Sequence, residues 1–258
     1  MIGETATNRH LATVTGKDAI TFLQGLLTND VLPLGQAPGL VWTAFLSPQG
    51  KYLADLFVVN TGAALLLDLP AGLAEDVLKR LSMYRLRADV QITPTTDLFV
   101  TRGLGGSPEG GFADPRHPAL GWRRYGTACG TPPRIDWDSL RVANLIPEAT
   151  VELIPNDSYI LEWGFERLHG VDFRKGCYVG QEVTARMKHK TELRKGIARV
   201  LVSGPIEIGT EITAEGKAVG HVFTQSGGQA IAYLRYDRVS DTMTAGGAAV
   251  MFLEKNDA

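Results

Sequence analysis

The sequence has few cysteines, little excess charge and no long apolar run, and each shortage excludes a class of protein. Its two cysteines, Cys129 and Cys177, are too few for a disulfide framework or a self-sufficient four-cysteine metal site. They favour a reducing compartment. The 26 basic and 28 acidic side chains nearly cancel, so binding of nucleic acid through bulk charge is not expected.

Membrane and export signals are also missing. No apolar run approaches the roughly 20 residues that a membrane-spanning helix needs. Residues 1–10 lack the basic segment followed by an apolar one that marks a leader. We therefore expect a cytoplasmic protein with neither a membrane nor direct nucleic acid as a partner. Its 258 residues can bury a large core as one domain or two.

Hydrophobic spacing predicts a mixture of strands and helices, and the mixture changes near residue 190. Before that point we expect the strands 11–15, 41–46, 53–59, 63–69, 90–93 and 98–102. The expected helices there are 19–27, 72–87, one from 136 or 138 to 145, 159–168 and one after Cys177. Beyond it, short strands at 197–202, 218–223, 230–234 and 248–252 predict a small antiparallel barrel or sandwich. The predicted domains are therefore 1–190 and 191–258.

A basic stretch at residues 188–195 marks this predicted boundary. Such a stretch is most often a solvated connector. The alternative is a surface that attracts an anionic ligand tail or an anionic partner.

Cys177 lies in the most informative stretch of the chain, KGCYVGQE at residues 175–182. The residues from Gln181 onward favour a helix, so the cysteine is expected just before a helix N-terminus, where unsatisfied N–H groups favour an anion. Lys175 adds positive charge, so a thiolate would be stabilised there, whereas the carboxylate of Glu182 acts in the opposite direction.

Local chemistry leaves two interpretations of this cysteine open. Gly176 and Gly180 allow positive φ or close approach to a ligand, which favours a reactive or ligand-contacting thiol. The alternative is a small buried hydrophobic side chain in a glycine-punctuated turn, the commoner fate of a free cysteine.

Several motifs together resemble those of one family. Residues 175–182 fit K-G-C-[FY]-x-G-Q-E at every position, and residues 170–173, GVDF, lead into them. Residues 16–30 are similar to G-x-D-A-x-x-F-L-Q-G-x-x-T-N-D, and residues 47–55 to S-P-x-G-K-x-x-x-D. This set resembles the YgfZ family of folate-binding proteins, relatives of mitochondrial Iba57 in the superfamily of the glycine-cleavage T-protein, an aminomethyltransferase.

The resemblance implies a fold and a function. The implied fold is α+β: a T-protein-like disc of mixed sheets and helices around a central opening, with a small C-terminal β-barrel. The implied cofactor is tetrahydrofolate or a derivative, whose pterin needs an apolar or aromatic wall. The implied function is that of a folate-binding accessory factor for iron–sulfur cluster assembly or repair. Its partners would be a reduced folate, assembly proteins and client enzymes, including those that modify tRNA.

The resemblance also implies roles for single residues. Cys177 is the expected functional thiol, and Asp55 matches the carboxylate near the reactive end of the folate in aminomethyltransferases. The expected folate contacts are Arg9, Trp137, Arg141, Lys175, Gly176, Tyr178, Gln181 and Glu182. No resident metal site is expected.

Two of these residues also have a purely structural explanation, and one residue typical of aminomethyltransferases is replaced in this chain. Asp55 could be surface decoration in a strand, and Trp137 a core or half-buried aromatic. Ala143 stands where aminomethyltransferases carry the glutamate that contacts the pterin. The missing acceptor removes a hydrogen bond worth about 1–3 kcal/mol if the group is buried.

Three functions stay open from the sequence. In the leading one, Cys177 holds a transient adduct or supplies one ligand of a cluster shared with a partner, since one thiolate cannot hold a cluster alone. The second is a tetrahydrofolate-dependent one-carbon transferase with Asp55 as an electrostatic or acid–base group. The third is an interaction scaffold that has lost its ligand.

Overall fold

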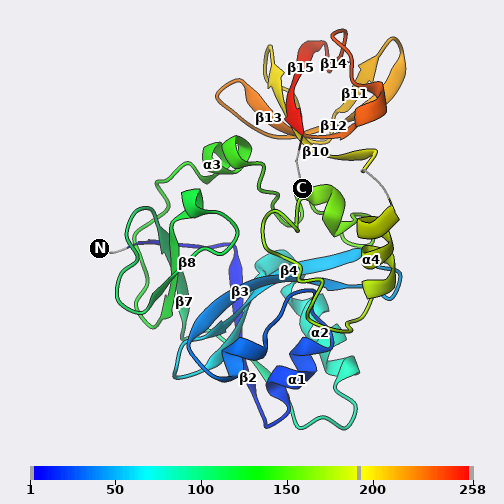
Figure 1. Cartoon of the computed structure of the whole chain (residues 1–258). Coiled ribbons are helices and arrows are strands. Elements are labelled where there is room, and N and C mark those ends of the chain that lie inside the picture. The colour runs from blue at the N-terminus through cyan, green and yellow to red at the C-terminus, as the bar shows by residue number, and fades with distance from the viewer. Residues whose placement is uncertain (1–2, 191–192, 256–258) are drawn as a thin grey trace.

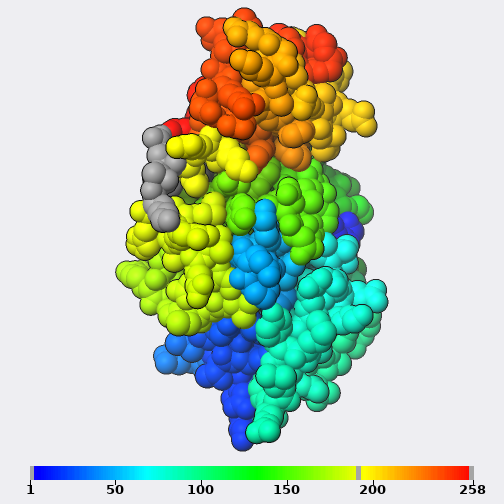
Figure 2. Space-filling view, turned by 90° about the vertical axis from the view of Figure 1, so that its right-hand side faces the viewer, coloured from blue at the N-terminus to red at the C-terminus, as the bar shows by residue number. Residues whose placement is uncertain are grey.

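Two antiparallel sheets and a closed barrel make up the protein. The computed structural model describes residues 3–190 and 193–255. Both sheets belong to the main body, and the barrel forms a separate lobe at one end of the molecule (Figures 1 and 2). Within the described ranges, no helix has both the length and the apolar character needed to cross a membrane.

The larger sheet has five strands in the order β3-β4-β5-β2-β6. Helices α1 and α2 cover one of its faces (Figure 1) and pack on a buried cluster that includes Leu23, Leu56 and Leu81. All but the last residue of β4 are buried, because both faces of this interior strand are covered. The bounds are β2 (Arg9–Thr15), β3 (Gly39–Leu46), β4 (Tyr52–Asn60), β5 (Leu65–Pro70), β6 (Gln91–Thr95), α1 (Ala19–Gln24) and α2 (Ala74–Tyr84), with 3-10 turns η1 (Leu32–Gly35) and η2 (Ala71–Leu73).

The smaller sheet has four strands in the order β1-β7-β9-β8. Its members are β1 (Glu4–Thr5), β7 (Phe99–Gly103), β8 (Gly111–Ala113) and β9 (Trp122–Gly126), with a 3-10 turn η3 (Pro118–Leu120) before β9. The sequence pattern predicted only β7, because β1 and β8 are short and β9 carries two arginines.

A buried ionic cluster joins the two sheets. Asp68 of β5 accepts hydrogen bonds from Arg9 Nε of β2 at 2.6 Å, Arg123 Nη2 of β9 at 2.7 Å and the Tyr125 hydroxyl at 2.8 Å. Burial alone would raise the pKa of Asp68, but the two guanidiniums outweigh it and hold that pKa below its ordinary value. The Arg123 guanidinium also lies over the ring of Phe57, 4.2 Å from its centroid.

Three helical segments connect the sheets to the barrel: α3 (Trp137–Asn144), η4 (Ile160–Trp163) and α4 (Gln181–Lys190). Asp136 caps α3 by accepting from the Ser139 amide at 2.9 Å. The helix predicted over 159–168 is wrong in extent. Only the 3-10 turn η4 forms, because Gly164 takes a left-handed conformation with φ 77° directly after it.

The C-terminal strands close into a six-stranded barrel in the order β10-β13-β12-β11-β14-β15, which excludes the sandwich alternative. Val200, Val222 and Leu234 are among the side chains that fill its interior. Its elements are β10 (Lys195–Val202), β11 (Glu211–Ala214), β12 (Lys217–Ser226), β13 (Gln229–Arg235), η5 (Tyr236–Arg238), β14 (Thr244–Ala245) and β15 (Ala248–Lys255). The domain boundary predicted between 190 and 191 adjoins residues 191 and 192, which lie outside the described residues.

Candidate functional site

Cys177 lies on the surface, in an irregular turn that ends where α4 begins at Gln181. Gly176 and Gly180 on either side have φ of 96° and 83°, a conformation that side chains with Cβ rarely adopt. The interpretation of this cysteine as a buried hydrophobic residue is therefore wrong. Its sulfur is accessible to a partner or a reagent.

Lys175 fixes this turn to the end of α1. Its Nζ donates to the carbonyls of Gln24 and Leu27, each at 2.5 Å, and Gln24 Nε2 donates to the Lys175 carbonyl at 3.3 Å. Burial lowers the pKa of Lys175 to about 8, and the carboxylates of Asp30 and Asp172 only partly oppose that shift. The ammonium is thus engaged with backbone carbonyls two residues away from the thiol.

The turn between β3 and β4 packs against the start of α4, so two motifs that are distant in the sequence lie side by side. A Cβ on Gly180 would lie 2.5 Å from the Ser47 carbonyl oxygen, and one on Gly50 would lie 2.7 Å from Val183 Cβ. Both glycines also have positive φ. This close approach requires glycine at both positions and fixes the position of the segment that carries Cys177.

The other expected residues of the KGCYVGQE stretch have distinct surroundings. Tyr178 is buried, and the Lys175 ammonium lies 5.0 Å from its ring centroid. Burial raises the pKa of its hydroxyl to about 12. Gln181 and Glu182 form the first turn of α4, with Glu182 exposed.

Asp55 is buried in β4, which excludes surface decoration. Its two carboxylate oxygens accept from Trp42 Nε1 and from the Tyr52 hydroxyl, each at 2.8 Å. The Trp42 ring stacks on Phe165 with centroids 4.3 Å apart. Asp55 therefore positions two large aromatic side chains in the core.

Trp137 and Arg141 line a cavity of about 390 Å³ between the main body and the barrel. Trp137 is half-buried, and the Arg102 guanidinium lies 4.1 Å from its ring centroid. Burial lowers the pKa of Arg102 to about 10. The residues that line this cavity are Asn8, Arg102, Trp137, Asp138, Arg141, Glu148, Val151, Ile208, Thr224 and Gln225, and Cys177 is not among them.

The remaining two expected folate contacts are engaged with protein carboxylates. Arg9 is bound to Asp68 in the cluster between the sheets. Arg141 Nη1 donates to Glu152 at 3.0 Å, and its Nη2 donates to Asp138 at 3.0 Å and to Thr224 at 2.9 Å. Both guanidiniums therefore join parts of the chain that are far apart in sequence.

The structure adds cavity residues that the sequence did not suggest. Arg102 stacks over Trp137, and Glu148 accepts from Asn8 Nδ2 at 3.2 Å at the same cavity. Glu148 supplies a carboxylate there, whereas Ala143 in α3 has none. No motif marks these residues, because they come together only when β7, the turn before β2 and the segment after α3 meet.

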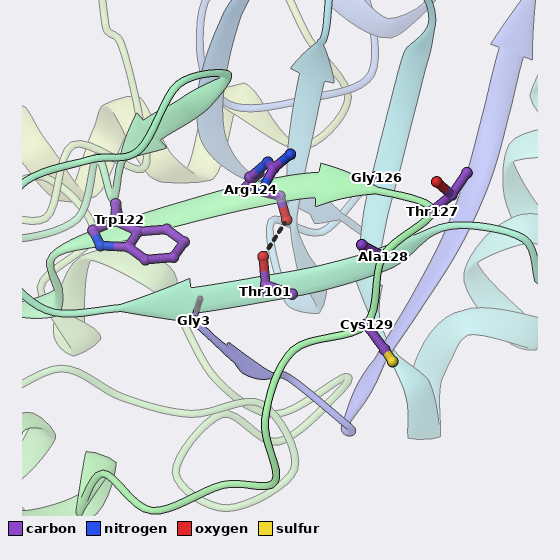
Figure 3. Close-up of a pocket in the computed structure, with 8 residues that line it drawn as sticks. All are labelled: Gly3, Thr101, Trp122, Arg124, Gly126, Thr127, Ala128 and Cys129. Atoms are coloured by element: carbon purple, nitrogen blue, oxygen red, sulfur yellow. Dashed lines mark hydrogen bonds between the residues drawn. The ribbon is translucent and has the colours of Figure 1, made fainter. Parts of the chain in front are cut away.

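The second cysteine lines a different and smaller pocket, of about 270 Å³. Figure 3 shows Cys129 at one end of this pocket and Trp122 at the other, with the sulfur directed away from the indole. The lining residues are Gly3, Thr101, Trp122, Arg124, Gly126, Thr127, Ala128 and Cys129. Cys129 is exposed like Cys177, so it provides a natural control for experiments on that thiol.

Comparison with known domains and structures agrees with the fold. Residues 194–255 match the family model described as the CAF17 C-terminal beta-barrel domain. The glycine cleavage system aminomethyltransferase T from Bartonella henselae is a structural neighbour with a TM-score of 0.70, covering 97% of this chain and 84% of that chain. At 15% sequence identity this likeness establishes the fold alone, and it confirms the expected T-protein-like architecture.

Curated relatives share one name. The mitochondrial iron–sulfur cluster assembly factor IBA57 homolog of Mycosarcoma maydis is 32% identical over 74% of this chain and 54% of its own length. The human and mouse mitochondrial IBA57 proteins are 31% and 30% identical, over 90% of this chain and 76% of theirs. This chain thus spans about half the length of the fungal relative and about three quarters of the mammalian ones.

These relatives also correct one expectation. Their names describe them as mitochondrial, which contradicts the cytoplasmic location expected from the sequence. A low cysteine count indicates a reducing compartment and does not by itself identify which one. With 31% identity over 76% of the human protein, the chain belongs to the family of IBA57 iron–sulfur cluster assembly factors, which supports the expected role in cluster assembly over that of a one-carbon transferase.

Proposed function

We propose that this protein serves iron–sulfur cluster assembly through the thiol of Cys177. The observation that carries the proposal is the exposure of this sulfur on a turn whose backbone is fixed on both sides. Lys175 holds one side of the turn to α1, and Gly180 holds the other against the β3–β4 turn. A thiol that is accessible and yet held in place is suited to contact a cluster carried by another protein.

The cluster in this proposal is a cargo that two proteins share. A single thiolate cannot hold an iron–sulfur cluster, which needs about four ligands. Within the described ranges, no group of three or more His, Cys, Asp or Glu side chains is arranged to hold a metal ion. Cys177 would therefore supply one ligand, or a transient adduct, while the partner supplies the rest.

The test replaces Cys177 by alanine in cells that lack the native protein. The readout is a cluster-dependent client, such as a radical enzyme that methylthiolates tRNA. We expect loss of client activity with Cys177→Ala and normal activity with Cys129→Ala, since Cys129 is also an exposed free cysteine. Full rescue by Cys177→Ala would remove the thiol from the mechanism.

We further propose that a reduced folate, such as tetrahydrofolate, binds in the cavity beside Trp137. The indole offers a flat wall for a pterin or benzoyl ring, Arg102 adds a cation, and Glu148 offers an acceptor for an amino edge. A cavity of about 390 Å³ lies within the range of small-molecule sites.

Folinic acid titrated against the protein tests this second proposal. We expect quenching of tryptophan fluorescence in the native chain, and a loss of both quenching and calorimetric heat in Trp137→Leu. Trp122→Leu is not a suitable control because that side chain is buried. Glu109→Gln, on a surface loop elsewhere, should leave binding unchanged. Equal heats of folinic acid binding for the native chain and Trp137→Leu would exclude this cavity as the folate site.

A further inference from the structure

Basic side chains gather in a groove of about 450 Å³ on the outside of the barrel. Its cations are Arg194, Lys195, Arg235 and Arg238, and all four are exposed. Arg194 and Lys195 belong to the basic stretch at the start of the barrel, whereas the other two lie about forty residues further along the chain. The fold therefore gathers positive charge that the sequence keeps in two separate places.

Strand pairing explains how the groove forms. Lys195 of β10 lies directly opposite Arg235 of β13, and His221 of β12 lies opposite Tyr233 of the same strand. Arg238 of η5 is fixed at the groove by donating to the Ala218 carbonyl at 2.8 Å. Like charges directly opposite each other on neighbouring strands are unfavourable, so this arrangement costs stability unless an anion offsets it.

The nearby carboxylates do not balance these cations. Lys195 Nζ lies 3.7 Å from Glu162, which also accepts from the Tyr233 hydroxyl at 2.6 Å, and Arg235 lies 3.5 Å from Asp237. Among the residues the structure describes, no carboxylate lies within ion-pair distance of Arg194 or Arg238. Four cations thus face two paired carboxylates, while Glu211 lies opposite His221 at the far side of the groove.

The floor of the groove is apolar and aromatic. Tyr233 is half-buried and stacks on Trp163 of η4 with centroids 5.1 Å apart, so its ring is held rigidly at the joint between the barrel and the main body. The backbones of β12 and β13 approach closely here, since a Cβ on Gly220 would lie 1.9 Å from the Tyr233 carbonyl oxygen. A narrow apolar floor with a cationic rim suits a carboxylate-bearing segment that also carries an apolar side chain.

We propose that this groove binds an acidic peptide segment of a partner protein. The chain has a formal net charge of −2, and its positive charge here is confined to one groove with an apolar floor, which favours a peptide over a polyphosphate backbone. In the sequence, Arg194 and Lys195 of the groove follow the C-terminal end of α4, and Cys177 precedes its N-terminal end. The ten residues of this helix span about 15 Å. The proposal does not depend on the role assigned to Cys177.

Fluorescence anisotropy with a defined probe tests the groove directly. The probe is a fluorescein-labelled peptide of glutamates around one central phenylalanine. We expect the native chain to bind it with an affinity that falls as sodium chloride is added. Reversing two rim charges, in Arg235→Glu/Arg238→Glu, should weaken binding by about tenfold or more. Lys79→Glu/Arg80→Glu on α2 changes the net charge equally and should leave binding intact.

Three further measurements control for misfolding, for a contribution of Cys177 and for binding of nucleic acid. Thermal unfolding checks that the charge-reversal variant folds, and Arg235→Ala/Arg238→Ala is the milder substitute if it does not. Cys177→Ser should bind the probe like the native chain. The proposal for the groove can therefore fail without the proposal for the Cys177 thiol failing, and the reverse. Absence of probe binding, or equal weakening by both double reversals, would overturn the proposal. A uridine oligonucleotide that binds more tightly than the peptide and is lost in the Arg235→Glu/Arg238→Glu variant would reassign the groove to nucleic acid.

Discussion

Arg141 Nη1 lies 3.0 Å from Glu152 Oε2, and both side chains also contact the hydroxyl of Thr224 in the barrel. Thr224 Oγ1 accepts from Arg141 Nη2 at 2.9 Å and donates to Glu152 Oε1 at 2.5 Å. All three side chains are buried. One hydroxyl therefore links an ion pair of the main body to strand β12.

Thr224→Val should destabilise the protein without changing the shape of this joint. Valine matches threonine in size but can neither accept from Arg141 nor donate to Glu152, and both charged groups are buried. We expect the free energy of unfolding to fall by about 1–3 kcal/mol, measured by urea denaturation. The exposed Thr244→Val serves as the control and should change it by less than about 0.5 kcal/mol. Equal effects of the two substitutions would refute the role of the hydroxyl.

Asp68→Asn should have a larger effect, because it removes the buried carboxylate that Arg9 and Arg123 share across the two sheets and leaves Arg123 only its longer contact, at 3.7 Å, with Asp114. Uncompensated buried charge costs about 3–5 kcal/mol, so we expect a loss of this size in the free energy of unfolding. Asp76 is the matched control, since its pair with Arg80 is exposed on α2 and Asp76→Asn should cost less than about 1 kcal/mol. Similar midpoints of thermal unfolding for the two variants would contradict this account.

Local sequence patterns predicted the elements that depend on local contacts. The turn at 47–50 lies between β3 and β4 as expected, and helix α2 forms within the predicted range because its apolar residues recur at helical spacing. Strand β9 was missed because Arg123 and Arg124 interrupt any apolar alternation. Arg123 is buried only because Asp68, fifty-five positions earlier, meets it across the sheets.

The candidate site divides in the same way. The motif around Cys177 predicted that this cysteine lies just before a helix, because a cysteine between two glycines ahead of helix-forming residues is a local feature of the sequence. Its contact with the turn at 47–50 is not local, because Gly50 and Gly180 meet only in the folded chain. Arg141 was predicted as a folate contact. Its hydrogen bond to Thr224 in the barrel could not be predicted, because the two residues are eighty-three positions apart and meet only in the folded chain.

Both cysteines should react with a thiol reagent while the protein is folded. Cys129 and Cys177 are both exposed, and neither takes part in a disulfide. Titration with Ellman's reagent without denaturant should release two equivalents from the native chain and one from each of Cys129→Ser and Cys177→Ser. Release of the second equivalent only after denaturant is added would place one sulfur in the interior and contradict the exposed turn.

Gly180→Ala should move the turn that carries Cys177. The added Cβ would lie 2.5 Å from the Ser47 carbonyl oxygen, and φ at this position is 83°. We expect a loss of about 1–3 kcal/mol in the free energy of unfolding from backbone strain, with a changed rate of Cys177 alkylation. Gly72→Ala is the control, because no atom lies within 4 Å of its Cβ position. An unchanged alkylation rate in Gly180→Ala would separate the thiol from this contact.

The ammonium of Lys175 should make stability depend on pH in a defined window. Burial lowers its pKa in the folded protein from 10.5 to about 8, so between these values the unfolded chain holds a proton that the folded chain has released. Because the unfolded state binds more protons there, the free energy of unfolding rises with pH across this window. Below about 8 both states are protonated, and this contribution is constant.

Comparison with Lys175→Met isolates this effect from the other groups that titrate in the same range. The stability of the native chain relative to Lys175→Met should increase as the pH rises from about 8 towards 10.5, as measured by urea denaturation at several pH values. Lys17→Met, at an exposed position, provides the matched control for removing a lysine. A difference between the native chain and Lys175→Met that stays constant over this range would contradict the lowered pKa of Lys175. It would mean that the hydrogen bonds to the carbonyls of Gln24 and Leu27 stabilise the ammonium enough to cancel the effect of burial.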